Sequence, residues 1–426
     1  MRCIFFFSLL IICCTKEPIL VIQDTGTLPK LEIIIDDYYL WSPDSGLYVI
    51  GTNGADNCGV IANYNQKWEY PAKVKYIENN SIIFDEKVGL RIKGNCSRAL
   101  PMKSFGLYWR EIYGDPQLNY PVFINKNVSS FNRLFLRNSG GEYIRTHLTD
   151  ISIVSIIKDY ANVEYQEYLQ AVVYLNNEYW GIYNIREMIT PHFFENNFGL
   201  AQGNIDLLQV SPGESEINPT ADNGNANSYI NDIVSFIQTN DLSDDNSYNH
   251  IESLIDVDNY IDYVIINTYI GNWDWPGNNI KWWKDRTDNS SKWRWILFDM
   301  DAGFDLKRIE SVWIGDLFGD PTPFPVYEND AAFYLFNNLI KNLHFKQKFL
   351  NRYLYFIENV FNKDRVASLI YKNKNTISAE YPNLQKKWNT LTMSEWENEI
   401  DKLITFNNQR NDIMKKIIKA LINEHN

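Results

Sequence analysis

The feature that most restricts the fold is a change in hydrophobic period near the middle of this 426-residue chain. The first half contains short segments that alternate or are rich in β-branched residues, and turns of Gly, Asn and Asp separate them. Such segments predict antiparallel strands, here at 31–35, 47–50, 72–77, 82–84, 88–92 and 104–109. From Ile233 onward the apolar residues recur mainly at helical spacing, as in Leu335, Leu339 and Leu343. The pattern predicts an α+β fold, with strands first and helices later.

Several intermediate segments refine this organisation. Apolar spacing predicts a helix within 143–160, and 167–187 is typical of a β-hairpin with its turn at 176–178. The polar stretch 211–229 is predicted to be a mobile loop between two lobes. A second hairpin, from 280–284 and 293–300, interrupts the helical half. A β-rich lobe in 18–210, a crossing at 211–229 and a helical lobe in 230–426 have the layout of a protein kinase.

Composition limits the partners. Lys and Arg together number 40 and Asp and Glu 53, which gives a net charge of −13. We therefore expect no nucleic-acid partner, because neutralising phosphates needs a basic surface. The aromatic content of 15% favours rings that fill a large core, and the alternative is a row of exposed rings that stack on sugars.

The first 17 residues are predicted to be a targeting segment. Arg2 precedes an apolar run at 4–12, which is too short to span a bilayer. The run ends in Cys13 and Cys14, and it resembles the lipobox of bacterial lipoproteins with Cys14 as the lipidated residue. Cys13 is a rival cleavage point, and ordinary signal-peptidase cleavage is the alternative. The resemblance implies an exported lipoprotein of the cell envelope, attached to the membrane only through its lipid.

Two cysteines, Cys58 and Cys96, remain for the body of the protein. They could pair in an oxidising envelope, but two cysteines do not make a disulfide framework. We expect both to be free thiols.

Residues with the chemistry of phosphoryl transfer concentrate after a predicted helix. The loop Gly-Asn-Trp-Asp-Trp-Pro-Gly-Asn-Asn (271–279) has Asp274 and Asn279 at the spacing of a kinase catalytic loop. One carboxylate there accepts the proton of the attacking hydroxyl, while an amide oxygen holds a magnesium ion. The second hairpin then ends in Asp299 and Asp301, where a kinase has a metal-binding aspartate. An Asp-x-Asp pair also occurs in glycosyltransferases that bind nucleotide sugars through a metal.

Five sequence blocks, taken in order, resemble the CotH kinase family, whose type member is spore coat protein H. The resemblance runs from about residue 28 to about residue 410, and the blocks lie at 88–105, 131–150, 173–187, 271–279 and 293–305. It implies an atypical two-lobed protein kinase that moves the γ-phosphoryl group of ATP to a hydroxyl on a protein, with Mg²⁺ or Mn²⁺. One departure is Asn95 and Cys96, which replace small Gly and Ser residues in the loop nearest the phosphates.

The resemblance also implies roles for individual residues. Asp274 would be the catalytic base, and the metal ligands would be Asn279, Asp299 and Asp301. Nucleotide contacts would come from four further residues: Lys103 and Arg98 at the phosphates, Glu187 near adenine or paired with Lys103, and Asp150 as a rival partner of Lys103.

Two other functions stay open. A degenerate kinase fold could serve binding alone in an envelope lipoprotein, which the altered Asn95 and Cys96 loop favours. Carbohydrate chemistry, with aromatic platforms and an aspartate pair, is the third possibility.

Overall fold

The computed structural model describes residues 28–211, 214–310 and 333–423. The predicted targeting segment and Cys14 therefore lie outside the described residues. The fold is α+β: the N-terminal half is rich in strands and the C-terminal part is helical, as expected. None of the helices in the described ranges is long and apolar enough to cross a membrane.

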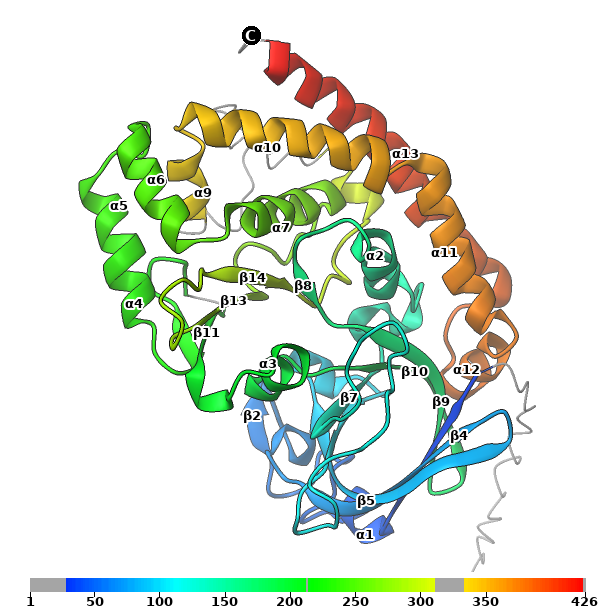
Figure 1. The fold of residues 1–426 in the computed structure, drawn as a ribbon. Coiled ribbons are helices and arrows are strands. Elements are labelled where there is room, and N and C mark those ends of the chain that lie inside the picture. The colour runs from blue at the N-terminus through cyan, green and yellow to red at the C-terminus, as the bar shows by residue number, and fades with distance from the viewer. Residues whose placement is uncertain (1–27, 212–213, 311–332, 424–426) are drawn as a thin grey trace, which may run out of the picture.

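A closed seven-stranded barrel forms the N-terminal half (Figure 1). Its strands pair antiparallel except for the first and last in the barrel order, which pair parallel. In that order they are β1 (Lys30–Ile35), β4 (Tyr70–Glu78), β5 (Ser81–Lys93), β6 (Ser104–Tyr108), β7 (Arg133–Arg137), β10 (Glu178–Arg186) and β9 (Tyr168–Leu175). Alternate residues point inward, so every strand contributes apolar side chains to one core.

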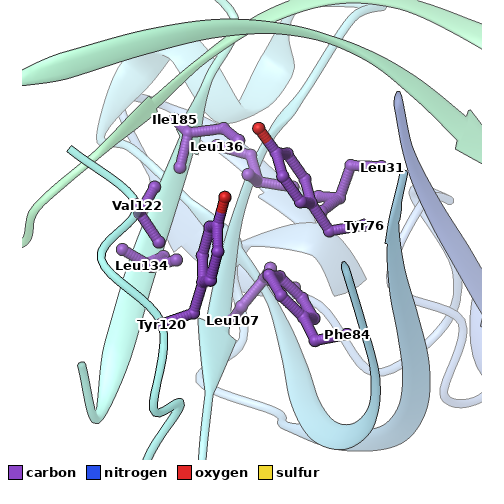
Figure 2. Close-up of a pocket in the computed structure, with 9 residues that line it drawn as sticks. All are labelled: Leu31, Tyr76, Phe84, Leu107, Tyr120, Val122, Leu134, Leu136 and Ile185. Atoms are coloured by element: carbon purple, nitrogen blue, oxygen red, sulfur yellow. The ribbon is translucent and has the colours of Figure 1, made fainter. Parts of the chain in front are cut away.

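The barrel interior is packed and offers no room for a ligand. Figure 2 shows nine residues, mostly Leu and aromatic, that line a gap of only about 10 Å³ in the barrel interior. Tyr76 stacks on Phe84 with ring centroids 5.3 Å apart, and burial raises the pKa of the Tyr76 hydroxyl. A volume of this size is close to the least that holds one water molecule.

A second sheet of five strands lies between the barrel and helices α7 and α10 (Figure 1). Its order is β12 (Thr220–Asn223), β11 (Ile205–Val210), β13 (Ile280–Asp285), β14 (Arg294–Leu297) and β8 (Glu164–Tyr165). The last pair is parallel, and β8 runs almost directly into β9 of the barrel. This short link joins the two sheets at the place where β14 ends.

The helical part surrounds α7 (Val257–Ile270), which is buried along nearly its whole length. Arg410 of α13 is itself buried and donates to the carbonyl oxygens of Thr268, Tyr269 and Ile309 at 2.6–3.0 Å. Two of these bonds go to carbonyls in the last turn of α7, where a helix has few backbone donors left. The other helices of the described ranges are α1 (Asp37–Trp41), α2 (Thr149–Ile157), α3 (Pro191–Phe198), α4 (Asn227–Tyr229), α5 (Ser235–Thr239), α6 (Asp245–Leu254), α9 (Tyr334–Leu339), α10 (Leu343–Tyr355), α11 (Lys363–Ser378), α12 (Tyr381–Trp388) and α13 (Met393–Asn423).

Most of the predicted elements are present, and the differences are these. Segments 82–84 and 88–92 belong to one strand, β5, and β7 was not among the predicted strands. Residues 47–50 form no strand, because the amides of Leu47 and Tyr48 instead donate to Tyr39 and Leu40 in and beside α1. The predicted loop at 211–229 contains β12 and α4.

The expectation of free thiols is wrong, because Cys58 and Cys96 form a disulfide with their Cα atoms 5.5 Å apart. Cys58 is in the turn of a small hairpin of β2 (Ala55–Asn57) and β3 (Val60–Ala62). Cys96 is in the loop after β5. The bond therefore fixes that loop to a part of the chain 38 residues away.

We expect the double variant C58S/C96S to unfold with a free energy about 2–4 kcal/mol lower than that of the wild type, because the unfolded chain gains freedom. Urea unfolding with and without dithiothreitol measures this. Reductant should lower the stability of the wild type by a similar amount and leave the variant unchanged. Equal stability of both proteins without reductant would contradict the assignment.

Candidate active site

An open cleft of about 540 Å³ is lined by four of the eight predicted site residues, Asp274, Asn279, Asp299 and Asp301. Four segments line it: the loop after β5 (94–97), the end of β7 and the turn after it (135–142), the loop after α7 (273–279) and the segment after β14 (299–302). The barrel contributes the first two and the second sheet with α7 contributes the others. The cleft therefore depends on how the two halves of the fold meet.

Local structure fixes the loop after α7. Gly271 ends the helix at φ 63°, a left-handed conformation that favours glycine. The side chain of Asn272 donates to Asn267 Oδ1 at 2.9 Å, and its own Oδ1 accepts the amide of Asp274 at 3.3 Å. Trp275 is buried and donates through Nε1 to the Tyr263 hydroxyl at 3.0 Å. The loop is thus anchored on both sides of Asp274.

The carboxylate of Asp274 lies against the two asparagines that end this loop. Its Oδ2 accepts from Asn279 Nδ2 at 2.7 Å and from Asn278 Nδ2 at 3.1 Å. Burial raises the pKa of Asp274, the Asn278 hydrogen bond opposes this, and the negative charge of Asp299 adds to it. A carboxylate with a raised pKa is a stronger general base. Because Asn279 uses its amide nitrogen here, its oxygen is the atom left for a cation.

Arg137, at the end of β7, holds the aspartates that follow β14. Its Nη2 donates to both Asp299 Oδ1 and Asp301 Oδ2, the second at 2.9 Å. Its Nε is 3.6 Å from Asp150 Oδ2. Burial alone would lower the pKa of Arg137, but the three carboxylates outweigh burial and raise it. Burial and the charge of Asp299 raise the pKa of Asp301 well above its usual range, although Arg137 opposes them.

Asp150, on α2, ties this group to the protein interior. It is buried, accepts from Arg186 Nη1, and receives the backbone amide of Met300 at 3.3 Å. Burial would raise the pKa of Asp150, but Arg186 and Arg137 hold it below its usual range. Because Met300 lies between Asp299 and Asp301, this contact orients both. Asp150 does not line the cleft, and it acts as a positioning residue through its contacts with Arg137 and with the amide of Met300.

The remaining predicted residues lie outside the cleft lining. Lys103 is buried, and its Nζ donates to the carbonyls of Arg98 at 2.5 Å and Leu100 at 2.9 Å. Arg98 donates to the carbonyls of Gly94 and Asn65. Glu187 pairs with Lys126 at 2.5 Å. The predicted pairing of Lys103 with Glu187 or Asp150 is therefore wrong, because carbonyls surround the lysine and other cations hold both acids.

The side chains that meet in the cleft fit a hard divalent cation. Asp299, Asp301 and Asn279 are oxygen ligands of the kind that Mg²⁺ prefers. Within the described ranges no three His, Cys, Asp or Glu side chains form a metal site by themselves. A cation here would therefore take its remaining ligands from water or from phosphate oxygens. Asn279 and Asp299 both have a left-handed backbone, at φ 57° and 55°, which is uncommon outside glycine and often marks functional sites.

Sequence reasoning missed Arg137 and Gly140. A weak signal was present, since Arg137 ends an apolar strand and precedes Asn138, Ser139 and Gly140, which form a turn. Gly140 has φ 59°, and a Cβ atom on it would be 2.2 Å from Asp301 Oδ2. Only glycine permits this approach of the turn to the aspartate.

We expect Gly140→Ala to lower the free energy of unfolding by about 1–3 kcal/mol, because the new methyl group displaces Asp301 and strains the backbone. Gly141→Ala is the matched control, since its Cβ would meet nothing within 4 Å. Urea unfolding of both variants tests this. A loss of stability as large at Gly141 as at Gly140 would show that the close approach to Asp301 does not matter.

Comparison with known families agrees with this geometry. The chain matches the family described as CotH kinase protein over residues 90–414, a span that is more than half of its length and that includes all four cleft segments. None of the curated proteins matches the chain. The matched region begins in β5, the strand that precedes the first cleft segment, and ends in α13. The chain belongs to the CotH kinase family.

Proposed function

We propose that this protein transfers the γ-phosphoryl group of ATP to a hydroxyl of a protein substrate, with a two-lobed kinase-like fold. Family membership implies kinase-like activity. The observation that supports the finer assignment is the meeting of two pairs in one cleft, Asp274 with Asn279 and Asp299 with Asp301. The first pair can accept a proton and the second can hold a cation with nucleotide phosphates.

Each residue has a distinct task in this proposal. Asp274, with its raised pKa, accepts the proton of the attacking hydroxyl. Asn279 and Asp299 hold Mg²⁺ or Mn²⁺, with Asp301 as a third ligand. Bound metal supplies charge stabilisation for the phosphates in transfer.

The contact between Arg137 and Asp150 supports the kinase-like interpretation of the fold. In protein kinases a strand lysine pairs with a helix glutamate, and both must be in place for activity. Here a strand arginine, Arg137 of β7, lies 3.6 Å from Asp150 of α2 and also contacts Asp299. Arg137, and not Lys103, is thus the strand cation that contacts Asp150.

A second candidate is nucleotide or protein binding without catalysis. It is favoured by one observation, that the guanidinium of Arg137 already engages oxygens of both Asp299 and Asp301. A metal must share or displace this cation. Mutation of the base separates the two candidates.

We expect Asp274→Asn to lower the phosphotransfer rate about 10²–10⁴-fold and to leave ATP affinity nearly unchanged, because the amide keeps the shape and removes the base. Asp299→Asn should weaken metal-dependent ATP binding and turnover together. Calorimetry and ³²P incorporation measure the two effects. Asp288→Asn, in the exposed turn between β13 and β14, is the matched control. Transfer by Asp274→Asn at the wild-type rate would exclude Asp274 as the base.

We further propose that the protein is an exported lipoprotein of the cell envelope. The proposal rests on the sequence alone, on the apolar run at 4–12 followed by Cys13 and Cys14. A lipid chain on Cys14 would hold the protein at the membrane.

We expect Cys14→Ala to release the protein from the membrane fraction, and globomycin to accumulate the precursor of the wild type. Fractionation and immunoblotting measure both effects, with Cys13→Ala as the control that should remain attached. Membrane attachment of the Cys14→Ala protein would contradict lipidation at this residue.

A further inference from the structure

The outer face of strands β5, β6 and β7 carries cations toward the cleft. Because side chains alternate along a strand, Arg91 and Lys93 share one face of β5. The register places Lys93 opposite Ser104 and Arg91 opposite Gly106 on β6, and Gly106 opposite Phe135 on β7. Ser104 and Phe135 both line the cleft, as does Gly94 next to Lys93. Lys93 is therefore flanked by residues that line the cleft, although it is not itself part of the lining.

Gly106 shows where the stem of this lysine runs. A Cβ atom on Gly106 would be 3.0 Å from Lys93 Cγ and 3.0 Å from Met188 Cε. The lysine stem thus crosses the bare backbone of Gly106 beside Met188, in the segment that connects β10 to α3 and the second sheet.

Among the described residues Lys93 has neither an anionic partner nor a carbonyl that accepts from its ammonium group. Arg137 and Arg186 contact aspartates, Lys281 pairs with Asp222, and Lys103 donates to carbonyls. Burial, followed by the positive charges of Arg91, Arg98, Lys281 and Arg133, lowers the pKa of Lys93 to about 8. The partly buried Lys93 ammonium, with other positive charges around it, would be stabilised by binding an anion.

The cleft itself needs such a cation. Its lining includes four acids, Glu142, Asp274, Asp299 and Asp301, against the two arginines Arg137 and Arg145. Both arginines already contact carboxylates. A nucleotide tail could meet a metal at the acidic end, but its other oxygens would lack a cationic partner there.

We propose that Lys93, rather than Lys103, binds the phosphate tail of the nucleotide. The inference rests on the proposed phosphotransferase function and adds the residue that recognises the polyanion. The Lys93 ammonium supplies the charge, and the disulfide-fixed loop at 94–97 borders the same space. The metal and Lys93 then hold the tail from opposite sides.

The test is calorimetric titration of the full chain with Mg·ATP and with adenosine. Lys93→Met should weaken Mg·ATP binding about 10–100-fold, the loss typical of a charged hydrogen bond, and leave adenosine binding unchanged. Lys93→Arg should retain most of the affinity for Mg·ATP. Lys87→Met is the matched control, because Lys87 is exposed on the same face of the same strand, roughly 20 Å away.

A pH series gives a second readout. The wild type should bind Mg·ATP more weakly as the pH rises above about 8, because the free lysine loses the proton that binding requires. The other charged groups that act on Lys93 are Arg91, Arg98, Arg133 and Lys281, and Lys281 pairs with Asp222. The Lys93→Met variant should lack this slope.

The outcomes are separable. A wild type that binds no nucleotide overturns the proposed function itself. A wild type that binds Mg·ATP and a folded Lys93→Met variant that binds it equally well overturn only the role of Lys93. A parallel loss of ATP and adenosine affinity would show that the lysine acts through structure, which also overturns the inference. Should Lys93→Met not fold, the Lys93→Arg affinity and the wild-type pH slope decide.

Discussion

The contact of Arg137 with three aspartates is the interaction on which the rest of the site depends. One guanidinium from the barrel meets Asp150 of α2 and the two aspartates that follow β14. Removing charges from water costs several kcal/mol per ion, and only close, hydrogen-bonded pairing offsets it. A partly formed cluster would leave buried charges unpaired and would be unstable. The barrel, α2 and the second sheet are therefore expected to take their mutual positions together.

The second sheet explains how distant parts of the chain reach this cluster. Strand β8 leaves α2 and pairs in parallel with β14, so Asp150 and Asp299 come from segments that flank the same strand pair. The chain then enters the barrel through β9 and returns through α3 to β11. The chain crosses between the two sheets three times here, from β7 to β8, from β8 to β9 and from β10 to β11, so the cleft depends on these connections and not on either sheet alone.

The hairpins and the Asp274 loop could be predicted, because turn residues and strand periodicity involve residues that are neighbours in the sequence. The predictions that failed depended on where a side chain points and on contacts between residues far apart in the sequence. Lys103 was expected at the phosphates, but its amine points into backbone carbonyls, and Lys93, ten residues earlier, faces outward. Arg137 could not be assigned from its strand alone, since its partners are up to 164 residues away. The pairing of Cys58 with Cys96 likewise needed the 5.5 Å separation that only the fold provides.

The contacts of Arg410 indicate in which order parts of the site can form during synthesis. Its guanidinium satisfies the carbonyls of Thr268 and Tyr269, immediately before the loop that carries Asp274. A ribosome makes those two residues about 140 residues before it makes Arg410. During synthesis the end of α7 therefore lacks this donor until Arg410 of α13 has been made. A helix made long after the Asp274 loop thus completes the hydrogen bonding of the turn that precedes this loop.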